Sequence, residues 1–290
     1  MTGEALFNKI WVIESLKNGN LKTGYNLVHD QLAHINFKNP AIEVVYESPE
    51  NKENFLQILN NIHDDASQND NYPMIHIDCH GNKDGLEVTS GEIITWEDLR
   101  PILIKINIAC KLNLVILLAS CNGAHLIKVV TKLDRAPFWA VIGSNIEVTV
   151  GSVEQNYGEF YRVFADNLDG NAAMKALNQG KQDQEREYHF LSALGLFVKA
   201  YSQYHNDYCV GKGKKQRIEN LLSKALKDPK VWHRGIKWIR QTLKDGLGSD
   251  EENFLNYHKE FFMIDLFEGN AQRFQLTFND LLAQAKLRKP

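Results

Sequence analysis

The chain has 290 residues, of which 43% are hydrophobic and 24% charged, and its formal net charge is −3. This composition is typical of a globular protein with one large domain or two smaller ones, and it argues against a strongly basic nucleic-acid binder. Residues 1–180 hold 14 Lys and Arg against 22 Asp and Glu, net −8, whereas residues 181–290 hold 19 against 14, net +5. The change of sign predicts a domain boundary near residue 180.

Short apolar runs alternate with helical patterns through the first 180 residues. Strands are expected at 9–16, 41–46, 74–79, 112–119 and 138–143, with a hairpin around residues 89–91. Helices are expected at 25–35, 51–62, 96–106, 124–133, 153–168 and 171–179, with Thr95 as the N-cap of the third. Strands separated by helices predict an α/β fold, with a mostly parallel sheet covered by helices on both faces.

After about Gly180 the pattern predicts helices only, at 185–208, 215–226, 231–243, 251–267 and 273–287. Ser249 with Glu252 fits a capping box. We therefore expect residues 181–290 to form an all-helical region that regulates the first domain or recruits its substrate. The basic segment 211–217 is expected to be a solvated loop rather than a nucleic-acid contact, and Trp232 and Trp238 are expected to pack in a core.

The four cysteines are spread along the chain without a CxxC pair, which argues against a disulfide framework. The amino terminus lacks the pattern of a signal peptide, and no apolar run reaches the roughly 18 residues that span a bilayer. These features predict a cytoplasmic protein with reduced thiols and no membrane association.

Two of the predicted strands end in reactive residues. The strand 74–79 runs into His80 and Gly81, and the strand 112–119 runs through Ser120 into Cys121. Neighbouring parallel strands would bring His80 and Cys121 to the same edge of the sheet, where ligands bind in this fold class. The imidazole could take the thiol proton and later protonate a leaving amine, while the backbone N–H groups of Gly81 and Cys121 could stabilise an oxyanion. A helix soon after Cys121 would favour the thiolate.

The order of these elements resembles the caspase-like cysteine peptidases, and most closely the CHAT branch that is related to separase. The resemblance covers roughly residues 9–180 and includes IHIDCHGNKDGL, LEVTSGEIITWEDL, LVILLASCNGA, AVIGSNIEV and EFYRVFADNLDGNAAMKAL. It implies that Cys121 is the nucleophile and His80 the general base and acid, with no metal or organic cofactor. It also implies a protein substrate and a role as a bacterial defence or cell-death effector, with an activating partner or self-association.

The sequence departs from the family beside the nucleophile. Asn122 stands where proteolytic caspases have an Arg, and Ala119 stands where metacaspases have an Asp. A pocket for an acidic side chain needs a cation, and only Lys83 lies in the loops near His80. The candidate substrate-pocket residues are the following: Asp84, Asn122, Glu147 and Glu154. Cleavage after a basic or uncharged residue is therefore favoured over cleavage after aspartate.

Other readings of the same residues remain open. Cys79 adjoins His80, but strand alternation points the two side chains to opposite faces, so Cys79 is expected to be a packing residue. His76, Asp78 and His80 share one strand face and could be the ligands of a metal-dependent hydrolase, with Cys121 as a fourth. A catalytically silent caspase-like scaffold for protein interaction is the remaining alternative.

Overall fold

The computed structural model describes residues 5–131 and 133–287, which form two compact units. One unit extends to Ala193 and the other begins at Leu194. The expected boundary near residue 180 falls too early, because a further strand of the sheet lies between 180 and 193.

The first unit is built on a mostly parallel sheet with the strand order β2-β1-β3-β6-β7-β8. Its strands are β1 (Lys9–Ser15), β2 (Glu43–Glu47), β3 (Pro73–Gly81), β6 (Val115–Ala119), β7 (Ala140–Ser144) and β8 (Tyr188–Ser192). Every pair along this order is parallel except β7 and β8. The short strands β4 (Gly85–Glu87) and β5 (Ile93–Thr95) form the expected hairpin, and β4 extends the end of β3. The predicted α/β class, with a mostly parallel sheet, is confirmed.

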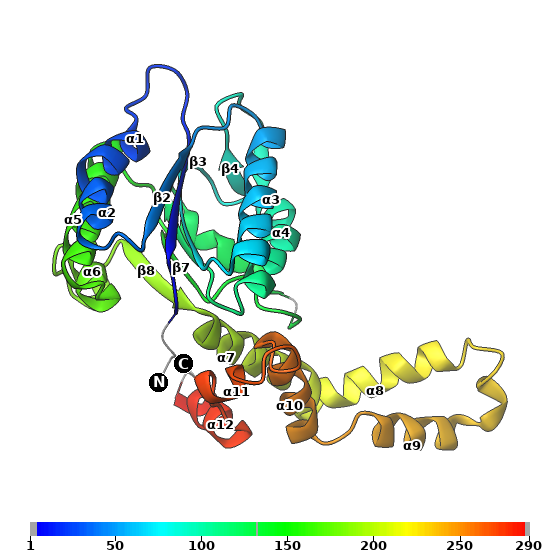
Figure 1. Cartoon of the computed structure of the whole chain (residues 1–290). Helices are drawn as coiled ribbons and strands as arrows, with labels where there is room; N and C mark the ends of the chain where they lie inside the picture. The colour runs from blue at the N-terminus through cyan, green and yellow to red at the C-terminus, as the bar shows by residue number, and fades with distance from the viewer. Residues whose placement is uncertain (1–4, 132, 288–290) are drawn as a thin grey trace. The chain divides into compact units, whose positions relative to one another are not determined.

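Helices cover both faces of this sheet (Figure 1). On one face lie α1 (Thr23–Leu27), the π-helical η1 (Val28–Leu32), α2 (Ala33–Lys38), α5 (Val150–Asn167) and α6 (Gly170–Leu177). On the other lie α3 (Lys52–Asn69), α4 (Trp96–Ala109) and the 3₁₀ helix η2 (Gly123–Thr131). The α5 face is packed with aromatic rings: Tyr157, Phe160, Tyr161 and Phe164 of α5 are all buried in the core. A further 3₁₀ turn, η3 (Asp183–Glu185), precedes β8.

The helices that follow strands are capped by their own sequences. Thr95 accepts the N–H of Asp98, which confirms the predicted N-cap, and the Asp98 side chain completes a capping box. Asn51 caps α3, Thr149 caps α5 and Asp169 caps α6 in the same way, through a side-chain oxygen. These caps fix where the chain leaves each loop and enters the helix, and so they fix the loops at the edge of the sheet.

The helix expected at 185–208 is wrong in its first part, because residues Tyr188–Ser192 form β8. The buried side chain of Asn178 holds the start of this strand: its Oδ1 accepts the Tyr188 N–H at 3.0 Å, and its Nδ2 donates to the Tyr188 carbonyl at 3.0 Å. The apolar residues of the helix that follows have a helical period, so the pattern predicts one long helix and misses the five-residue edge strand β8. The helix α7 (Ala193–Tyr204) begins only after it.

The helix expected at 124–133 is a 3₁₀ helix, η2. A Cβ atom at Gly143 would lie 2.9 Å from the backbone nitrogen of Ala124, so the backbone of η2 packs directly against β7. A Cβ atom at Gly123 would lie 2.7 Å from Cβ of Leu118. The two glycines allow this close approach, which a β-carbon at either position would prevent.

The second unit is all-helical, as expected, and has its own aromatic core. After α7 it contains the π-helical η4 (His205–Cys209), α8 (Gly211–Ala225), η5 (Trp232–Arg234), α9 (Ile236–Gly246), α10 (Asp250–Phe261), α11 (Asn270–Arg273) and α12 (Phe278–Leu287). The ring of Phe197 lies 5.1 Å from those of Phe261 and Phe262, centroid to centroid. Ser249 accepts the N–H of Glu252 at the start of α10, which confirms that cap. Residues 211–217 begin α8 and are not a loop.

Candidate functional site

The ends of β3 and β6 bring the two predicted reactive residues to one edge of the sheet. These strands are parallel neighbours, and Asp78 is paired with Ala119 in their register. Strand β6 ends at this pair, and Cys121 follows two residues later, at the edge of the sheet where His80 lies in β3. His80 is exposed and Cys121 is half-buried, so both are open to a substrate.

Gly81 makes the contact between the two strand ends possible. A Cβ atom at this position would lie 2.5 Å from the backbone carbonyl oxygen of Cys121 and 3.1 Å from Cβ of Ser120. Only glycine leaves room for the backbone of residues 120–121 to pass this close. The His-Gly and Ser-Cys elements therefore touch through their main chains.

The His80 ring is held by a residue that the sequence analysis did not identify. The side-chain amide of Asn20 lies 2.6 Å from Nε2 of His80. Asn20 follows β1, which is the other neighbour of β3 in the sheet. The loop after any strand next to β3 ends at the same edge, and that is the signal that would have pointed to residues 16–22.

The sulfur of Cys121 is held by the loop after β7. The Val148 N–H points at Sγ from 3.4 Å, and Sγ lies 3.5 Å from the Val148 carbonyl oxygen. Asn122 adopts a left-handed backbone with φ of 57°, and its N–H donates to Ile146 in the same loop at 3.1 Å. Within the described residues, no hydrogen bond joins the His80 ring to the Cys121 sulfur. Catalytic hydrogen bonds are often long in proteins without bound substrate.

The four candidate pocket residues lie in different places. Asp84 is exposed in the β3–β4 turn, 4.0 Å from the ammonium of Lys128, and it lines no cavity described here. Glu147 is exposed in the loop after β7. Asn122 follows Cys121 directly and leads into η2, and it lines neither of the two described cavities. Glu154, on the first turns of α5, is the one of the four that lines a cavity.

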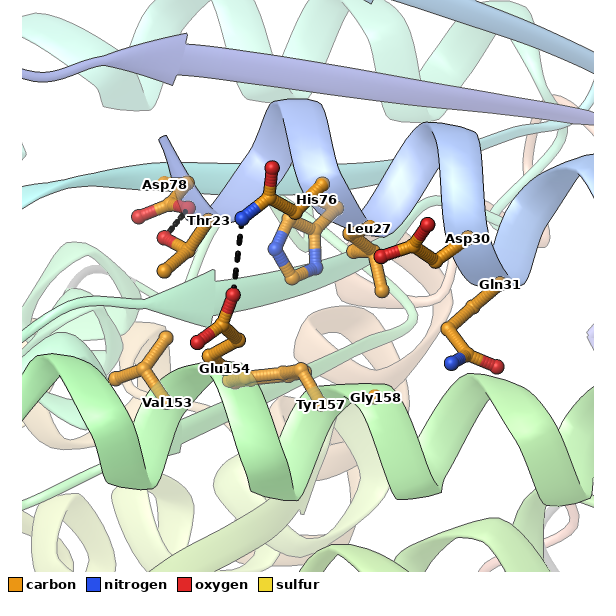
Figure 2. Close-up of a pocket in the computed structure, with 11 residues that line it drawn as sticks. Thr23, Leu27, Asp30, Gln31, His76, Asp78, Val153, Glu154, Tyr157 and Gly158 are labelled. Atoms are coloured by element: carbon orange, nitrogen blue, oxygen red, sulfur yellow. Dashed lines mark hydrogen bonds between the residues drawn. The ribbon is translucent and has the colours of Figure 1, made fainter. Parts of the chain in front are cut away.

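That cavity lies on the α5 face of the sheet and is rich in carboxylates. It has a volume of about 60 Å³ and is bordered by α1, η1, α5 and β3. Its walls carry the carboxylates of Asp30, Asp78 and Glu154, and its described lining residues include no Lys or Arg. In Figure 2, Asp78 and Glu154 come from different walls, and Asn26 donates to Glu154 Oε1 at 2.9 Å. Asp78 precedes His80 by two residues on the same strand face.

Burial controls the charge of the two β3 residues in this cavity. Desolvation raises the pKa of the Asp78 carboxyl from 3.8 to about 7, although the Thr23 hydroxyl donates to it. Desolvation lowers the pKa of His76 to about 3, so this ring is neutral near neutral pH. The hydroxyl of Tyr161 lies 3.3 Å from Nδ1 of His76. His76 is thus a core histidine, with an edge-on contact to Tyr157.

A second buried carboxylate fixes α1 above the cavity. Glu14 is fully buried on β1, and its Oε1 accepts the backbone N–H of Gly24 at 2.8 Å. Its Oε2 accepts the hydroxyl of Tyr46 at 2.7 Å, and burial, more than this contact, raises the pKa of that phenol. The loop that carries Asn20 is therefore anchored at both ends, by β1 and by α1.

The metal-hydrolase reading is not supported by this arrangement. His76 is committed to the aromatic core and His80 to Asn20, and no three His, Cys, Asp or Glu side chains among the described residues are grouped to hold a metal ion. Cys79 is buried on the other face of β3, and burial raises the pKa of its thiol well above 9.0. All four cysteines are free thiols.

No protein-family model matches the chain, and no curated protein sequence matches it either. Among solved structures, the chain is similar to the Arg-specific cysteine proteinase gingipain R (RgpB), with 11% sequence identity and a TM-score of 0.41 over 62% of this chain. It is similar to a complex of the pro- and mature domains of Porphyromonas gingivalis RgpB, with 14% identity and a TM-score of 0.40 over 62% of this chain. The chain covers 44% and 45% of the lengths of those two chains.

None of the helices in the described part of the chain is both long enough and apolar enough to cross a bilayer.

Proposed function

We propose that the protein is a cysteine endopeptidase that cleaves a partner protein through an acyl-enzyme on Cys121. The observation that carries this proposal is that His80 and Cys121 lie at the ends of two adjacent parallel strands, with Gly81 packed against the Cys121 carbonyl. The resemblance of the two sequence elements to caspase-like peptidases agrees with it.

The reaction needs one proton carrier and one nucleophile. His80 takes the Cys121 proton, the sulfur attacks the scissile carbonyl carbon, and the C–N bond breaks as the imidazolium returns the proton to the leaving amine. A water molecule, deprotonated by the same ring, then attacks the thioester carbonyl. The carboxylic acid leaves, and the thiol of Cys121 is restored.

Asn20 is a positioning residue in this scheme. A general base must present an unprotonated nitrogen to the thiol, and Asn20 occupies Nε2. The Asn20 Nδ2 group donates to Nε2, so Nε2 is the unprotonated nitrogen and Nδ1 carries the proton of the neutral ring. The Cys121 thiol reaches this base by replacing Asn20 at Nε2. The amide thereby selects the tautomer and the ring orientation.

The oxyanion is assigned to the backbone N–H groups of Gly81 and Cys121. Asn82 donates to the Gly85 carbonyl at 3.0 Å, and hydrogen-bonded pairs alternate in an antiparallel ladder. The Gly81–Leu86 pair is therefore the non-bonded kind, and the Gly81 N–H is directed away from β4. Such a donor costs no reorganisation when the tetrahedral intermediate forms.

The carboxylate-lined cavity supports a preference for a basic side chain before the cleaved bond. Of its acidic residues, Asp78 lies on the strand face that leads to His80, while Asp30 and Glu154 come from η1 and α5. A pocket for aspartate would need a desolvated cation. We therefore assign substrate selection to Glu154, with Asp78 and Asp30 beside it in the cavity. Asp84, Asn122 and Glu147 line neither of the two described cavities.

The biological setting rests on the sequence resemblance. We place the enzyme in the bacterial cytoplasm as a defence or cell-death effector that needs no cofactor. The helical unit would bind the activating partner, the substrate or a second copy of the chain.

Two single variants and one control test the proposal. Cys121→Ala and His80→Ala should each abolish cleavage of co-expressed neighbouring proteins, scored by mass spectrometry, and should keep the thermal unfolding of the wild type. Cys79→Ala should retain activity and lose only about 1 kcal/mol of stability, from a small void. Cleavage by Cys121→Ala would overturn the mechanism. No cleavage by the wild type, with a Cys121 thiol that resists alkylation, would favour the silent scaffold.

A further inference from the structure

The helical hairpin formed by α8 and α9 is the most basic part of the chain. Residues 211–246, which we call the basic hairpin, contain 11 Lys and Arg against three Asp and Glu, a net charge of +8. The rest of the chain carries the opposite sign, since the whole has −3. In Figure 1, α8 and α9 lie side by side as two arms of a hairpin joined by residues 226–235. At 15 residues, α8 alone is about 22 Å long.

A thin apolar seam holds the two arms together. Ile218 and Leu222 of α8 and Ile239 of α9 are the residues of the hairpin buried below a tenth of their surface. Arg240 clamps the arms from outside through both oxygens of Glu219, at 3.1 and 3.0 Å. This seam involves few of the hairpin's apolar side chains and few of its charged side chains, so most of both kinds lie outside it.

Large apolar side chains are exposed where the two arms meet, contrary to the expectation that the tryptophans pack in a core. Trp232 is 59% exposed and Trp238 is 48% exposed. Ile236 at 51% and Leu226 at 37% add two aliphatic side chains to the same end. We call these four residues the tip. A soluble surface rarely carries such a group without a partner.

Cations surround the tip and have no acidic partner among the residues that the structure describes. They are Lys224, Lys227, Lys230, Arg234 and Lys237. The ion pairs found in the hairpin involve only Arg240 with Glu219 and Lys214 with Asp250. Arg234 stacks instead on the indole of Trp238, 5.3 Å from the ring centroid. Positive charge and apolar surface therefore coincide at one end of the hairpin.

From this coincidence we infer that the basic hairpin docks the protein onto an anionic lipid bilayer, with the tip in the interface and the surrounding cations on lipid phosphates. Indole rings and Lys or Arg side chains are the groups that favour the boundary between headgroups and acyl chains. Polybasic segments add electrostatic attraction to anionic lipids. This inference is independent of the proposed peptidase activity.

A nucleic acid fits the tip less well. Phosphates and bases would use the cations and the indoles, but they would gain nothing from Leu226 and Ile236. A bilayer buries all four side chains of the tip at once. Peripheral docking also agrees with the lack of a bilayer-spanning helix in the described part of the chain.

Vesicle flotation with the full-length protein tests the inference. The protein should bind vesicles of phosphatidylcholine mixed with phosphatidylglycerol, should not bind phosphatidylcholine alone, and should lose binding as salt rises. Trp232→Ala with Trp238→Ala should weaken binding by at least about tenfold, and Lys227→Glu with Lys230→Glu should do the same. These side chains are exposed, so circular dichroism and thermal unfolding should match the wild type.

Matched controls lie elsewhere in the same unit. Leu255→Ala with Leu266→Ala removes two exposed apolar side chains, and Lys199→Glu with Lys259→Glu reverses two exposed charges. Both control proteins should bind like the wild type. Equal losses in the controls and the tip variants would overturn the inference, as would absence of vesicle binding. Binding of a single-stranded oligonucleotide by the wild type, lost in the tip variants while vesicles are ignored, would assign the hairpin to nucleic acid instead.

Discussion

At the scale of single residues, the two residues of the candidate site depend on partners from two different loops. His80 is held by Asn20 from the loop after β1, and Cys121 is held by Val148 from the loop after β7. Neither partner carries the reacting group. Together they decide where the ring and the sulfur point, and therefore whether a substrate can bring the two into contact.

Asn20 gives the first prediction. Asn20→Ala should lower kcat by about tenfold or more with little change in KM, because the ring loses its orientation and its tautomer. Asn20→Asp should restore part of kcat and should move the acid limb of the pH–rate profile to higher pH, because a carboxylate favours the protonated imidazole. Equal kcat and identical pH profiles in all three proteins would remove Asn20 from the mechanism.

Asp78 gives the second prediction, on stability. Burial raises its pKa from 3.8 to about 7, so between these values the unfolded chain releases a proton that the folded chain keeps. This group therefore makes the protein less stable as pH rises through that window. Asp78→Asn removes the effect. Its free energy of unfolding relative to the wild type should rise by about 1.4 kcal/mol per pH unit between roughly pH 4 and pH 7.

His76 conceals this effect in the wild type. Its pKa falls from 6.5 to about 3 on burial, so the unfolded chain binds a proton that the folded chain does not, and stability rises with pH over that range. The slopes from Asp78 and His76 are opposite. Urea unfolding of the wild type and Asp78→Asn across this pH range separates them, and a difference that stays constant with pH would contradict the assigned pKa of Asp78.

At the scale of secondary-structure elements, α5 connects the core to the carboxylate-lined cavity. One face of this helix supplies buried aromatic rings, while its first turns supply Val153, Glu154 and Tyr157 to the cavity. The N-cap at Thr149 fixes the start of the helix directly after the loop that holds the Cys121 sulfur. Helix position, cavity shape and nucleophile position are therefore linked.

The third prediction concerns Glu154. Glu154→Gln should lower kcat/KM about tenfold for peptides with Lys or Arg before the cleaved bond, and should leave peptides with Ala there nearly unchanged. Glu159→Gln is the matched control, because Glu159 is a half-buried carboxylate of α5 that bonds to Arg162 outside the cavity. A wild-type preference for Asp in a peptide library would show that the cavity does not select the substrate.

The elements also show what periodicity can predict. Strands β1, β3, β6 and β7 are long apolar runs, so their existence followed from the sequence, as did the Thr95 cap. The existence of β8 did not follow from the sequence, because its five residues lie directly before α7 and share the apolar character of that helix. The position of β8 depends on Asn178, ten positions earlier in the chain. The 3₁₀ form of η2 depends on tertiary contact at Gly143, which no local pattern reports.

The candidate site divides in the same way. His80 and Cys121 could be placed by topology alone, since parallel neighbours end at one edge. Asn20 could not, because its role requires the knowledge that β1 is the other neighbour of β3. The cavity could not be predicted from the sequence, because Asp30, Asp78 and Glu154 lie far apart along the chain.

At the scale of the whole molecule, the boundary after Ala193 determines which fragments can fold. A chain that ends at residue 180 lacks β8 and exposes the hydrogen-bonding edge of β7, whereas a chain that ends at Ala193 keeps the sheet complete.

The fourth prediction follows from this boundary. Residues 1–193 should be soluble, should unfold cooperatively, and should keep a Cys121 thiol that reacts with iodoacetamide. Residues 1–180 should aggregate. Size-exclusion chromatography of the two fragments decides the matter, and two equally soluble, equally cooperative fragments would show that β8 is dispensable.

The antiparallel pairing of β8 also has a consequence during synthesis. The ribosome releases β7 well before β8, with α5 and α6 made in between, so the nascent chain waits with one side of β7 unpaired while its reactive strand ends are already complete. Once Ser192 has been translated, β8 can pair with β7 and complete the sheet. A pause in that interval, or a premature stop, would leave a polypeptide with an open sheet edge, prone to aggregation.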